Sequence, residues 1–350
     1  DAARRALRAA RRPLILAGLD LLPAPGGPPP DGLAAFARAW SAPVLTTYKA
    51  KGVLPETDPR SLGAFGLSPK VDALLLPFVR EADVVVLAGY DPIEVRSPWR
   101  EPFGPDATVI ALSGQADDHG VHRMDHLFVG SVEAGLAALA DGLEPGPRDG
   151  GDVARLGAAL ADAVAPPAAW GPGALFATLA AAVPPDARWA VDTGAHRILL
   201  SQQLRCAWPR QLLQSSGLCT MGYALPVALG AKLAEPSRPV VAVVGDGGLE
   251  MVLGELATAR DLRLPVLVVV VDDRSLALIE KKQRAMGLPS RGVDSGGTDF
   301  ARVAEALGGV GVRCDDGAAL TRGVREGLAR TDTFTVLHCP VPRRAYDRAS

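Results

Sequence analysis

Short runs of β-branched and aliphatic residues recur along the whole chain, each followed by a turn and then by a stretch with helical spacing. Runs such as 239–244 and 265–271 show no alternation of apolar and polar residues. Strands of this kind are buried on both faces by the helices that lie between them. The pattern predicts an α/β protein built on parallel sheets.

The runs locate the expected elements. In the first half, strands are expected at 13–17, 43–47, 82–88, 107–112 and 126–129, and helices include 31–40 and 132–143. In the second half, strands are expected at 188–191, 211–214, 239–244, 265–271, 310–313 and 334–338. Each half is therefore predicted to be a doubly wound sheet of about five or six strands.

A linker separates the two halves. The segment Glu-Pro-Gly-Pro-Arg-Asp-Gly-Gly-Asp at 144–152 has no apolar period and is rich in turn-forming residues. We expect a Rossmann-like domain at 1–145, a linker at 146–168 and a second domain at 169–350. Ligands of such sheets bind at the carboxyl ends of the strands.

Composition narrows the class of protein. The 350 residues are 48% hydrophobic and 22% charged with a net charge of −2, which disfavours disorder and nucleic-acid binding. No apolar run approaches the roughly 20 residues of a membrane helix, and no basic start followed by an apolar stretch indicates a signal peptide. The four cysteines have no paired or metal-type spacing, so reduced thiols and a cytoplasmic location are expected.

Two carboxylates end two consecutive buried strands. Asp246 follows the run at 239–244, and Asp273, 27 residues later, follows the run at 265–271. A helix of about 12 residues, expected at 249–260, returns the chain to the same sheet edge, since a right-handed crossover makes the strands close parallel neighbours. Asp246 and Asp273 are therefore expected to converge.

Converging carboxylates repel one another unless a cation lies between them. Mg²⁺ is favoured because it takes oxygen ligands and completes its shell with water and phosphate. The peptide oxygen of Ser275 is a natural third ligand, and the glycines beside Asp246 leave room for a bulky anion. The alternative is that Asp246 and Asp273 cap the helices that follow them.

This segment resembles the diphosphate-binding signature of thiamine diphosphate enzymes, in the acetolactate synthase and 2-oxoacid decarboxylase group. The resemblance rests on Gly245-Asp246-Gly247-Gly248, on Glu-Leu-Ala-Thr-Ala at 255–259 and on Leu-Pro-Val at 264–266. It implies that Asp246 and Asp273 bind Mg²⁺ with Ser275, and that the three glycines lie against the cofactor. Asp272-Asp273 stands where the family usually has Asn-Asn, which adds a negative charge beside the diphosphate.

Two further segments carry the resemblance. Gly194-Ala195-His196 matches the family's turn at the terminal phosphate; a capping role is the alternative for His196. The segment Ser-Ser-Gly-Leu-Cys-Thr-Met-Gly at 215–222 matches the aminopyrimidine contact. There Met221 is expected to force the cofactor into its bent form, unless it only fills the core. Cys219 is expected to be a packing residue, since no adjacent His or cation lowers its pKa.

Two other segments have weaker links to the site. Glu280 and Gln283, in a charged run after Asp273, fall where relatives place residues over the thiazolium; a solvated helix face is the alternative. The arginine-rich end at 343–348 is expected to be exposed, or to form a tail that closes over the site.

The first half resembles the family's middle domain through 47–56 and 87–94. That domain binds FAD in some members, but no Gly-x-Gly-x-x-Gly follows the first strand here, so the sequence does not support FAD. The resemblance implies thiamine diphosphate and Mg²⁺ as cofactors.

The family's leading pyrimidine-binding domain, which carries its essential glutamate, has no counterpart in these 350 residues, which begin at Asp1 and not at Met. A separate subunit is expected to supply it, in a two-plus-two heterotetramer; truncation or processing is the competing explanation. The expected activity is acetolactate synthase-like carboligation of a 2-oxoacid such as pyruvate, a transferase or lyase reaction. Decarboxylation without ligation and a non-catalytic scaffold or regulatory subunit are the alternatives.

Overall fold

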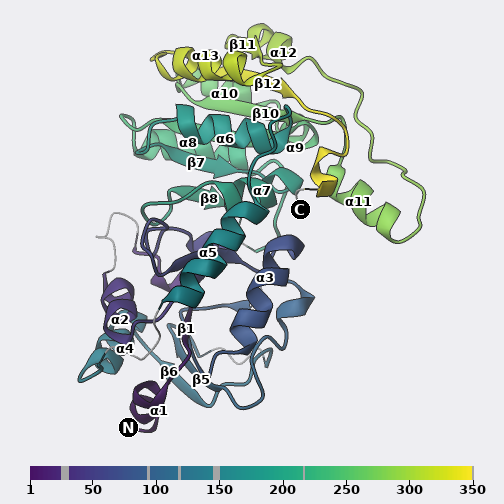
Figure 1. Cartoon of the computed structure of the whole chain (residues 1–350). Coiled ribbons are helices and arrows are strands. Elements are labelled where there is room, and N and C mark those ends of the chain that lie inside the picture. The colour runs from purple at the N-terminus through teal and green to yellow at the C-terminus, as the bar shows by residue number, and fades with distance from the viewer. Residues whose placement is uncertain (25–30, 93–94, 117–119, 145–149, 216, 349–350) are drawn as a thin grey trace. The chain divides into compact units, whose positions relative to one another are not determined.

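The computed structural model describes residues 1–24, 31–92, 95–116, 120–144, 150–215 and 217–348. It forms two compact units: Asp1–Ala163 with Arg205–Gln211, and Val164–Leu204 with Leu212–Ser350. Each unit is a six-stranded parallel sheet flanked by helices (Figure 1). The predicted fold class is confirmed.

The first unit has the strand order β3-β2-β1-β4-β5-β6, in which every described pair is parallel. This is the order of a Rossmann-type sheet, with its reversal between β1 and β4. The strands are β1 (Pro13–Ala17), β2 (Val44–Thr47), β3 (Ser61–Phe65), β4 (Val84–Ala88), β5 (Thr108–Ser113) and β6 (His126–Val129). The helices are α1 (Ala2–Ala9), α2 (Gly32–Trp40), α3 (Pro69–Arg80), α4 (Val132–Ala140) and α5 (Gly151–Ala163), with 3₁₀ turns η1 (Leu19–Leu21), η2 (Tyr48–Ala50) and η4 (Ser97–Trp99).

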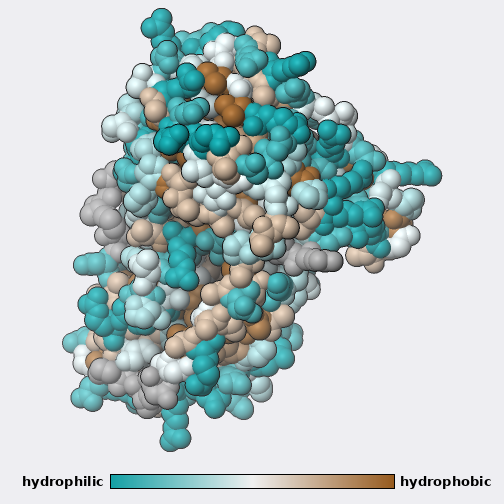
Figure 2. Space-filling view, turned by 45° about the horizontal axis from the view of Figure 1, so that its top comes forward, coloured by the Kyte–Doolittle hydropathy of each residue, from teal (hydrophilic) through white to brown (hydrophobic). Residues whose placement is uncertain are grey.

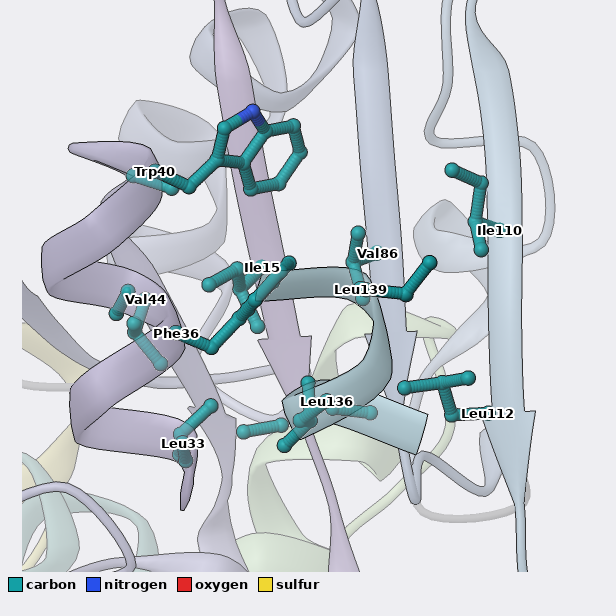
Figure 3. Packing of buried hydrophobic residues seen from close by; sticks show 14 of the residues in the cluster. Ile15, Leu33, Phe36, Trp40, Val44, Val86, Ile110, Leu112, Leu136 and Leu139 are labelled. Carbon is teal, nitrogen blue, oxygen red and sulfur yellow. The ribbon is translucent and has the colours of Figure 1, made fainter. Parts of the chain in front are cut away.

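One core of the first unit lies between the sheet and helices α2 and α4. Figure 3 shows Phe36 of α2 and Leu136 of α4 directed towards β1, β4 and β5, where Ile15, Val86 and Ile110 meet them. All five side chains are fully buried. The strands β1 and β4 are buried at every position, which explains why their sequences do not alternate.

The second unit has the strand order β11-β12-β10-β9-β7-β8, again with every described pair parallel. Its strands are β7 (Arg188–Val191), β8 (Leu212–Gln214), β9 (Val240–Gly245), β10 (Leu267–Asp272), β11 (Val310–Arg313) and β12 (Thr335–Pro340). Its helices are α6 (Pro172–Ala182), α7 (Ala195–Gln203), α8 (Ala224–Ala234), α9 (Asp246–Met251), α10 (Glu255–Asp261), α11 (Ala277–Ala285), α12 (Phe300–Ala306) and α13 (Gly317–Leu328), with the 3₁₀ turn η5 (Ala345–Arg348).

Helices cover both faces of the second sheet. On one face, Val268 and Val270 of β10 lie in one apolar cluster with Leu225 of α8 and Phe300 of α12. On the other face, α13 packs against β10 and β12 and against α6. Strands β9 and β10 are therefore buried on both sides, and both are apolar until they reach their carboxyl ends.

The structure adds one strand to the sequence prediction and divides one expected helix. Strand β3 was not predicted, because Ser61–Phe65 lacks a β-branched run and contains Gly63, whose φ is positive; it pairs with β2 through a register shift. The single helix expected at 249–260 is two helices, α9 and α10, which are separated by 252–254. Helix α5 lies within the range 146–168 that the sequence assigns to a linker.

The surface of the described residues is mixed in character. Figure 2 shows hydrophilic and apolar side chains interspersed over the face in view. No helix in the described ranges combines the length and the apolar character that a membrane crossing requires. All four cysteines, Cys206, Cys219, Cys314 and Cys339, carry free thiols.

The packing of α12 on β11 allows a test of the second unit. A methyl group on Gly311 would lie 1.9 Å from the backbone oxygen of Ala301. Gly311→Ala should therefore lower the free energy of unfolding by about 1–3 kcal/mol or more in urea denaturation, because the helix must move away from the sheet.

Gly230 of α8 provides a matched control, because a methyl group added there would have no atom within 4 Å. Gly230→Ala should leave the unfolding free energy unchanged or raise it by up to about 1 kcal/mol, since alanine favours helix. Equal effects of the two substitutions would contradict the described α12–β11 packing.

Candidate functional site

The strand order of the second sheet creates a crevice at one place. From β7 the chain moves outward to β8 and then returns to β9 on the other side of β7. Loops that leave β7 and β9 at their carboxyl ends therefore diverge to opposite faces, and open sheets bind ligands at such reversals. Asp192 and Gly194 follow β7, and Asp246 follows β9.

A pocket of about 230 Å³ lies at this reversal. It is lined by Thr193, Gly194, Ala195, His196, Cys219, Met221, Gly245, Asp246, Gly247, Gly248, Val271, Asp273, Ser275, Leu276, Ala277, Leu278, Ile279 and Tyr346. Every residue that the sequence assigned to cofactor or metal binding is in this set. The structure thus brings together segments that are far apart in the sequence.

Asp246 and Asp273 converge in the pocket, as the crossover argument predicts. Strands β9 and β10 are parallel neighbours, with Gly245 opposite Val271. Both carboxylates are buried, at 4% and 5% exposure. Burial and the charge of Asp246 raise the pKa of Asp273 to about 7, and burial is the main cause of the raised pKa of Asp246.

Neither Asp246 nor Asp273 is the capping residue of the helix that follows it. The caps of the following helices are Gly245 and Leu276, and neither helix has a side-chain cap. One oxygen of Asp246 accepts a hydrogen bond from the hydroxyl of Ser295 at 2.8 Å. Oδ2 of Asp273 is buried without a hydrogen-bond partner. Such an atom is costly to bury unless something else occupies the pocket beside it.

The two adjacent aspartates have different surroundings. Asp272 ends β10, and one of its oxygens lies 2.8 Å from Nε2 of His338 on β12, in a hydrogen bond. Its other oxygen accepts a hydrogen bond from the amide of Arg274 at 3.1 Å. Of the pair, only Asp273 lines the pocket.

The Gly194 turn presents an imidazole to the pocket. His196 is buried, and burial lowers its pKa to about 4, so that the ring is neutral at pH 7. The backbone of Asp192 hydrogen bonds the ring, whereas Nε2 is buried without a partner. A methyl group on Gly194 would lie 2.5 Å from Cε1 of His196. Glycine at this position therefore leaves the space that the histidine ring occupies beside the pocket.

Met221 and Cys219 contribute another wall of the pocket. Met221 is partly exposed, and its methyl group approaches Gly247. Cys219 has a positive φ of 51°, uncommon for a residue with a side chain. Its Sγ accepts a 3.5 Å hydrogen bond from Nη1 of the buried Arg197. The expectation that no cation adjoins Cys219 is therefore wrong: α7 brings Arg197 to it across 22 residues of sequence.

Glu280 and Gln283 lie outside the pocket lining. Glu280 of α11 is 2% exposed and pairs with Arg284 and Arg344 at 2.9 Å. Although burial opposes ionisation, the hydrogen bonds from these arginines lower the pKa of Glu280. Gln283 bonds the backbone of Arg291. In this structure Glu280 therefore anchors the C-terminal segment.

That segment contributes a pocket residue that the sequence did not reveal. Tyr346 of η5 is buried and lines the pocket, and Figure 1 shows the yellow segment that holds η5 beside α11. Burial and the charges of Asp273 and Asp246 raise the pKa of Tyr346 well above its usual value. Its neighbour Asp347 pairs with Arg284. Of the two expectations for this segment, a tail that closes on the site matches the placement of Tyr346.

Comparison with known proteins gives matches in both halves of the chain. The family model for the thiamine pyrophosphate enzyme central domain matches residues 1–139. The model for the C-terminal TPP binding domain of thiamine pyrophosphate enzymes matches residues 192–339. The second match includes every predicted metal ligand.

Several curated relatives align along most of the chain. A putative thiamine pyrophosphate-containing protein of Bacillus subtilis is 28% identical over 91% of this chain and 55% of the relative. An acetolactate synthase of the same species is 29% identical over 92% and 57%. A probable 2-ketoarginine decarboxylase of Pseudomonas aeruginosa is 30% identical over 94% and 58%. The chain spans about half the length of the curated relatives that it matches.

The raised pKa of Asp273 predicts how stability changes with pH in metal-free buffer. The unfolded carboxyl ionises near its ordinary value of about 3.9, whereas the folded one ionises near 7. The folded state therefore holds an extra proton between these values, and the contribution of Asp273 to stability falls as the pH rises through this range. Asp273→Asn should stabilise the chain at pH 8, and by less at pH 5, in urea titrations.

Asp315→Asn is the control, because its side chain is 61% exposed and lies after β11. A surface change of this kind should stay within about 0.5 kcal/mol at either pH. If Asp273→Asn also showed no difference between pH 5 and pH 8, the two carboxylates would not be in the buried arrangement described.

Proposed function

Because the chain belongs to the thiamine pyrophosphate enzyme family, we propose that its second unit holds the diphosphate of thiamine diphosphate through Mg²⁺. The observation that carries the proposal is the buried pair Asp246 and Asp273, with one carboxylate oxygen unpartnered. The reaction we propose is acetolactate synthase-like carboligation of a 2-oxoacid such as pyruvate, in the cytoplasm.

The carboxylate wall fits a divalent metal. At neutral pH two neighbouring buried carboxylates are destabilised by desolvation and mutual repulsion, and a cation removes both penalties. In the described part of the chain no three acidic, cysteine or histidine side chains converge on one point. A metal here would therefore use Asp246, Asp273 and the backbone oxygen of Ser275, with phosphate and water completing the shell, which is the usual Mg²⁺ arrangement.

The glycine-rich wall of the pocket fits a phosphate. The neutral ring of His196 donates its one proton to the backbone oxygen of Asp192, so its unpartnered Nε2 is an acceptor, and the donors for a phosphate are backbone amides. The nearby Gly245 and Gly247 lack side chains, so an anion can reach the backbone amides at the start of α9. One wall thus requires a cation and the other offers donors to an anion, as a metal diphosphate would need.

The cofactor, when bound, supplies the carbanion chemistry for cleaving the bond beside a 2-oxoacid carbonyl. The residues of this chain would bind and orient it and keep water from one side. Met221 would support its bent shape, and Cys219 would present backbone groups to its ring. The raised pKa of Tyr346 keeps that phenol protonated, so it could donate a hydrogen bond within the pocket. FAD is not part of this proposal.

The pocket alone is small for the whole cofactor. Its volume of about 230 Å³ is less than the roughly 300–1,000 Å³ usual for small-molecule sites. We propose that a pyrimidine-binding domain outside these 350 residues completes the site and supplies the catalytic glutamate. A separate subunit in a two-plus-two heterotetramer is the arrangement to test.

Calorimetric titration of thiamine diphosphate with Mg²⁺ tests the binding step. We expect binding that requires both components, and a loss of at least about tenfold in Asp246→Asn, since even outer-shell partners of a metal contribute that much. The control Asp315→Asn should bind as the unaltered chain does. Binding that needs no metal, or that survives the loss of Asp246, would contradict the proposal.

Measurement of the reaction products distinguishes carboligation from decarboxylation. Pyruvate is mixed with the chain, with cofactor and with the candidate pyrimidine-domain subunit, and both CO₂ and the ligation product are measured. Ligation product supports the carboligase, and CO₂ alone supports the decarboxylase alternative, which the similarity to a probable 2-ketoarginine decarboxylase favours. Full activity of the chain alone would rule out the separate subunit. No binding of the cofactor, with or without that subunit, would support the scaffold alternative.

A further inference from the structure

Asp192 is a fully buried carboxylate directly after β7. Its Oδ1 accepts hydrogen bonds from the amide of Thr193 at 2.9 Å and from that of Tyr223 at 3.0 Å, and its Oδ2 accepts one from the amide of Gly222 at 2.9 Å. These three backbone donors stabilise the negative charge of the carboxylate, because hydrogen bonds to an ionised group are stronger than those between neutral groups. The carboxylate therefore joins the end of β7 to a segment 30 residues later.

Two of these three amides belong to the residues directly after Met221. Gly222 and Tyr223 precede α8, and both of their amides are bonded to this one carboxylate. Met221 is the neighbouring residue whose side chain enters the pocket and approaches Gly247. Asp192 thus holds the backbone directly after Met221 in place.

The same residue also holds the phosphate-facing wall, by a separate group. The backbone of Asp192 hydrogen bonds the ring of His196, which lines the pocket. The side chain and the main chain of Asp192 therefore serve different walls. A substitution of the side chain can disturb Met221 and leave the bond to His196 in place.

Helix α9 packs closely against the same carboxylate. A methyl group on Gly248 would lie 2.2 Å from Oδ2 of Asp192. The carboxylate thus lies directly on the first turn of the helix that begins with Asp246. The amide donors on one side and the contact with α9 on the other together determine where the carboxylate lies.

We propose that Asp192 is a positioning residue for the proposed cofactor site, and that it acts through Met221 on the ring portion of the cofactor and not on its diphosphate. This inference rests on the proposed function. Asp192 itself does not line the pocket, so its effect on binding is indirect.

The test is Asp192→Asn, titrated calorimetrically with Mg²⁺ and either thiamine diphosphate or inorganic pyrophosphate. In the variant an NH₂ group replaces one carboxylate oxygen. Because this group cannot accept a hydrogen bond from a backbone amide, it displaces Gly222 or Tyr223. We expect the affinity for thiamine diphosphate to fall about tenfold or more, which is about 1.4 kcal/mol. The affinity for pyrophosphate should change less than about threefold. Equal losses for the two probes, or no loss, would overturn the inference.

A double-mutant cycle with Met221→Ala separates positioning from general destabilisation. If Asp192 acts through Met221, its substitution should cost little affinity in the Met221→Ala background, whereas independent effects would add. Leu320→Ala is the stability control: Leu320 is fully buried on α13, a helix that contributes no residue to the pocket. This control should lose stability and keep both affinities.

Hydrogen exchange measured on the unaltered full chain tests the role of Asp192 without a variant that must fold. The amides of Gly222 and Tyr223 should exchange slowly without cofactor, because both are bonded to a buried carboxylate. Exchange at the rate of an unstructured chain would overturn the inference. If the unaltered chain binds neither probe, the proposed function fails together with this role; if it binds both and Asp192→Asn binds both equally, only the role of Asp192 fails.

Discussion

Two carboxylates at one edge of a parallel sheet are the constraint on which the second unit depends. The pairing of β9 with β10 places Asp246 and Asp273 together in a pocket where both are largely removed from solvent. Burial raises the pKa of both groups, and the charge of Asp246 adds to the effect on Asp273. The fold thereby maintains an arrangement that is unfavourable without a ligand, and a pocket with that property is suited to a cation that bridges it to an anion.

The remainder of the pocket is organised around that edge. The reversal of strand order sends the loop after β7 and the loop after β9 to opposite sides, and so creates the two walls. Asp192 ties the loop after β7 to the segment that carries Met221. The ion pairs of Glu280 hold the C-terminal segment, which brings Tyr346 to the same pocket.

Membership in the thiamine pyrophosphate enzyme family agrees with this arrangement in both units. The change from the usual Asn to Asp273 has a physical consequence. A second buried carboxylate increases the attraction for a divalent metal and increases the repulsion from a diphosphate when the metal is absent. The order in which metal and diphosphate enter would then matter more in this chain than in relatives with the amide.

Local patterns and crossover geometry were sufficient for much of the fold and for the centre of the site. Unbroken aliphatic runs identified the strands buried on both faces, since such strands need no other signal. β3 was missed because an edge strand with Gly63 lacks that signal, and the break between α9 and α10 was missed because the apolar period continues across 252–254.

The convergence of Asp246 and Asp273 was predictable, because element lengths and the handedness of the crossover leave little choice. The other contacts that build the pocket and hold its surroundings depend on tertiary packing. The contacts of Arg197 with Cys219, of Asp192 with Gly222 and of Glu280 with Arg344 join segments 22, 30 and 64 residues apart. No periodicity encodes such contacts, because they arise from the way separate loops and helices pack at the edge of the sheet.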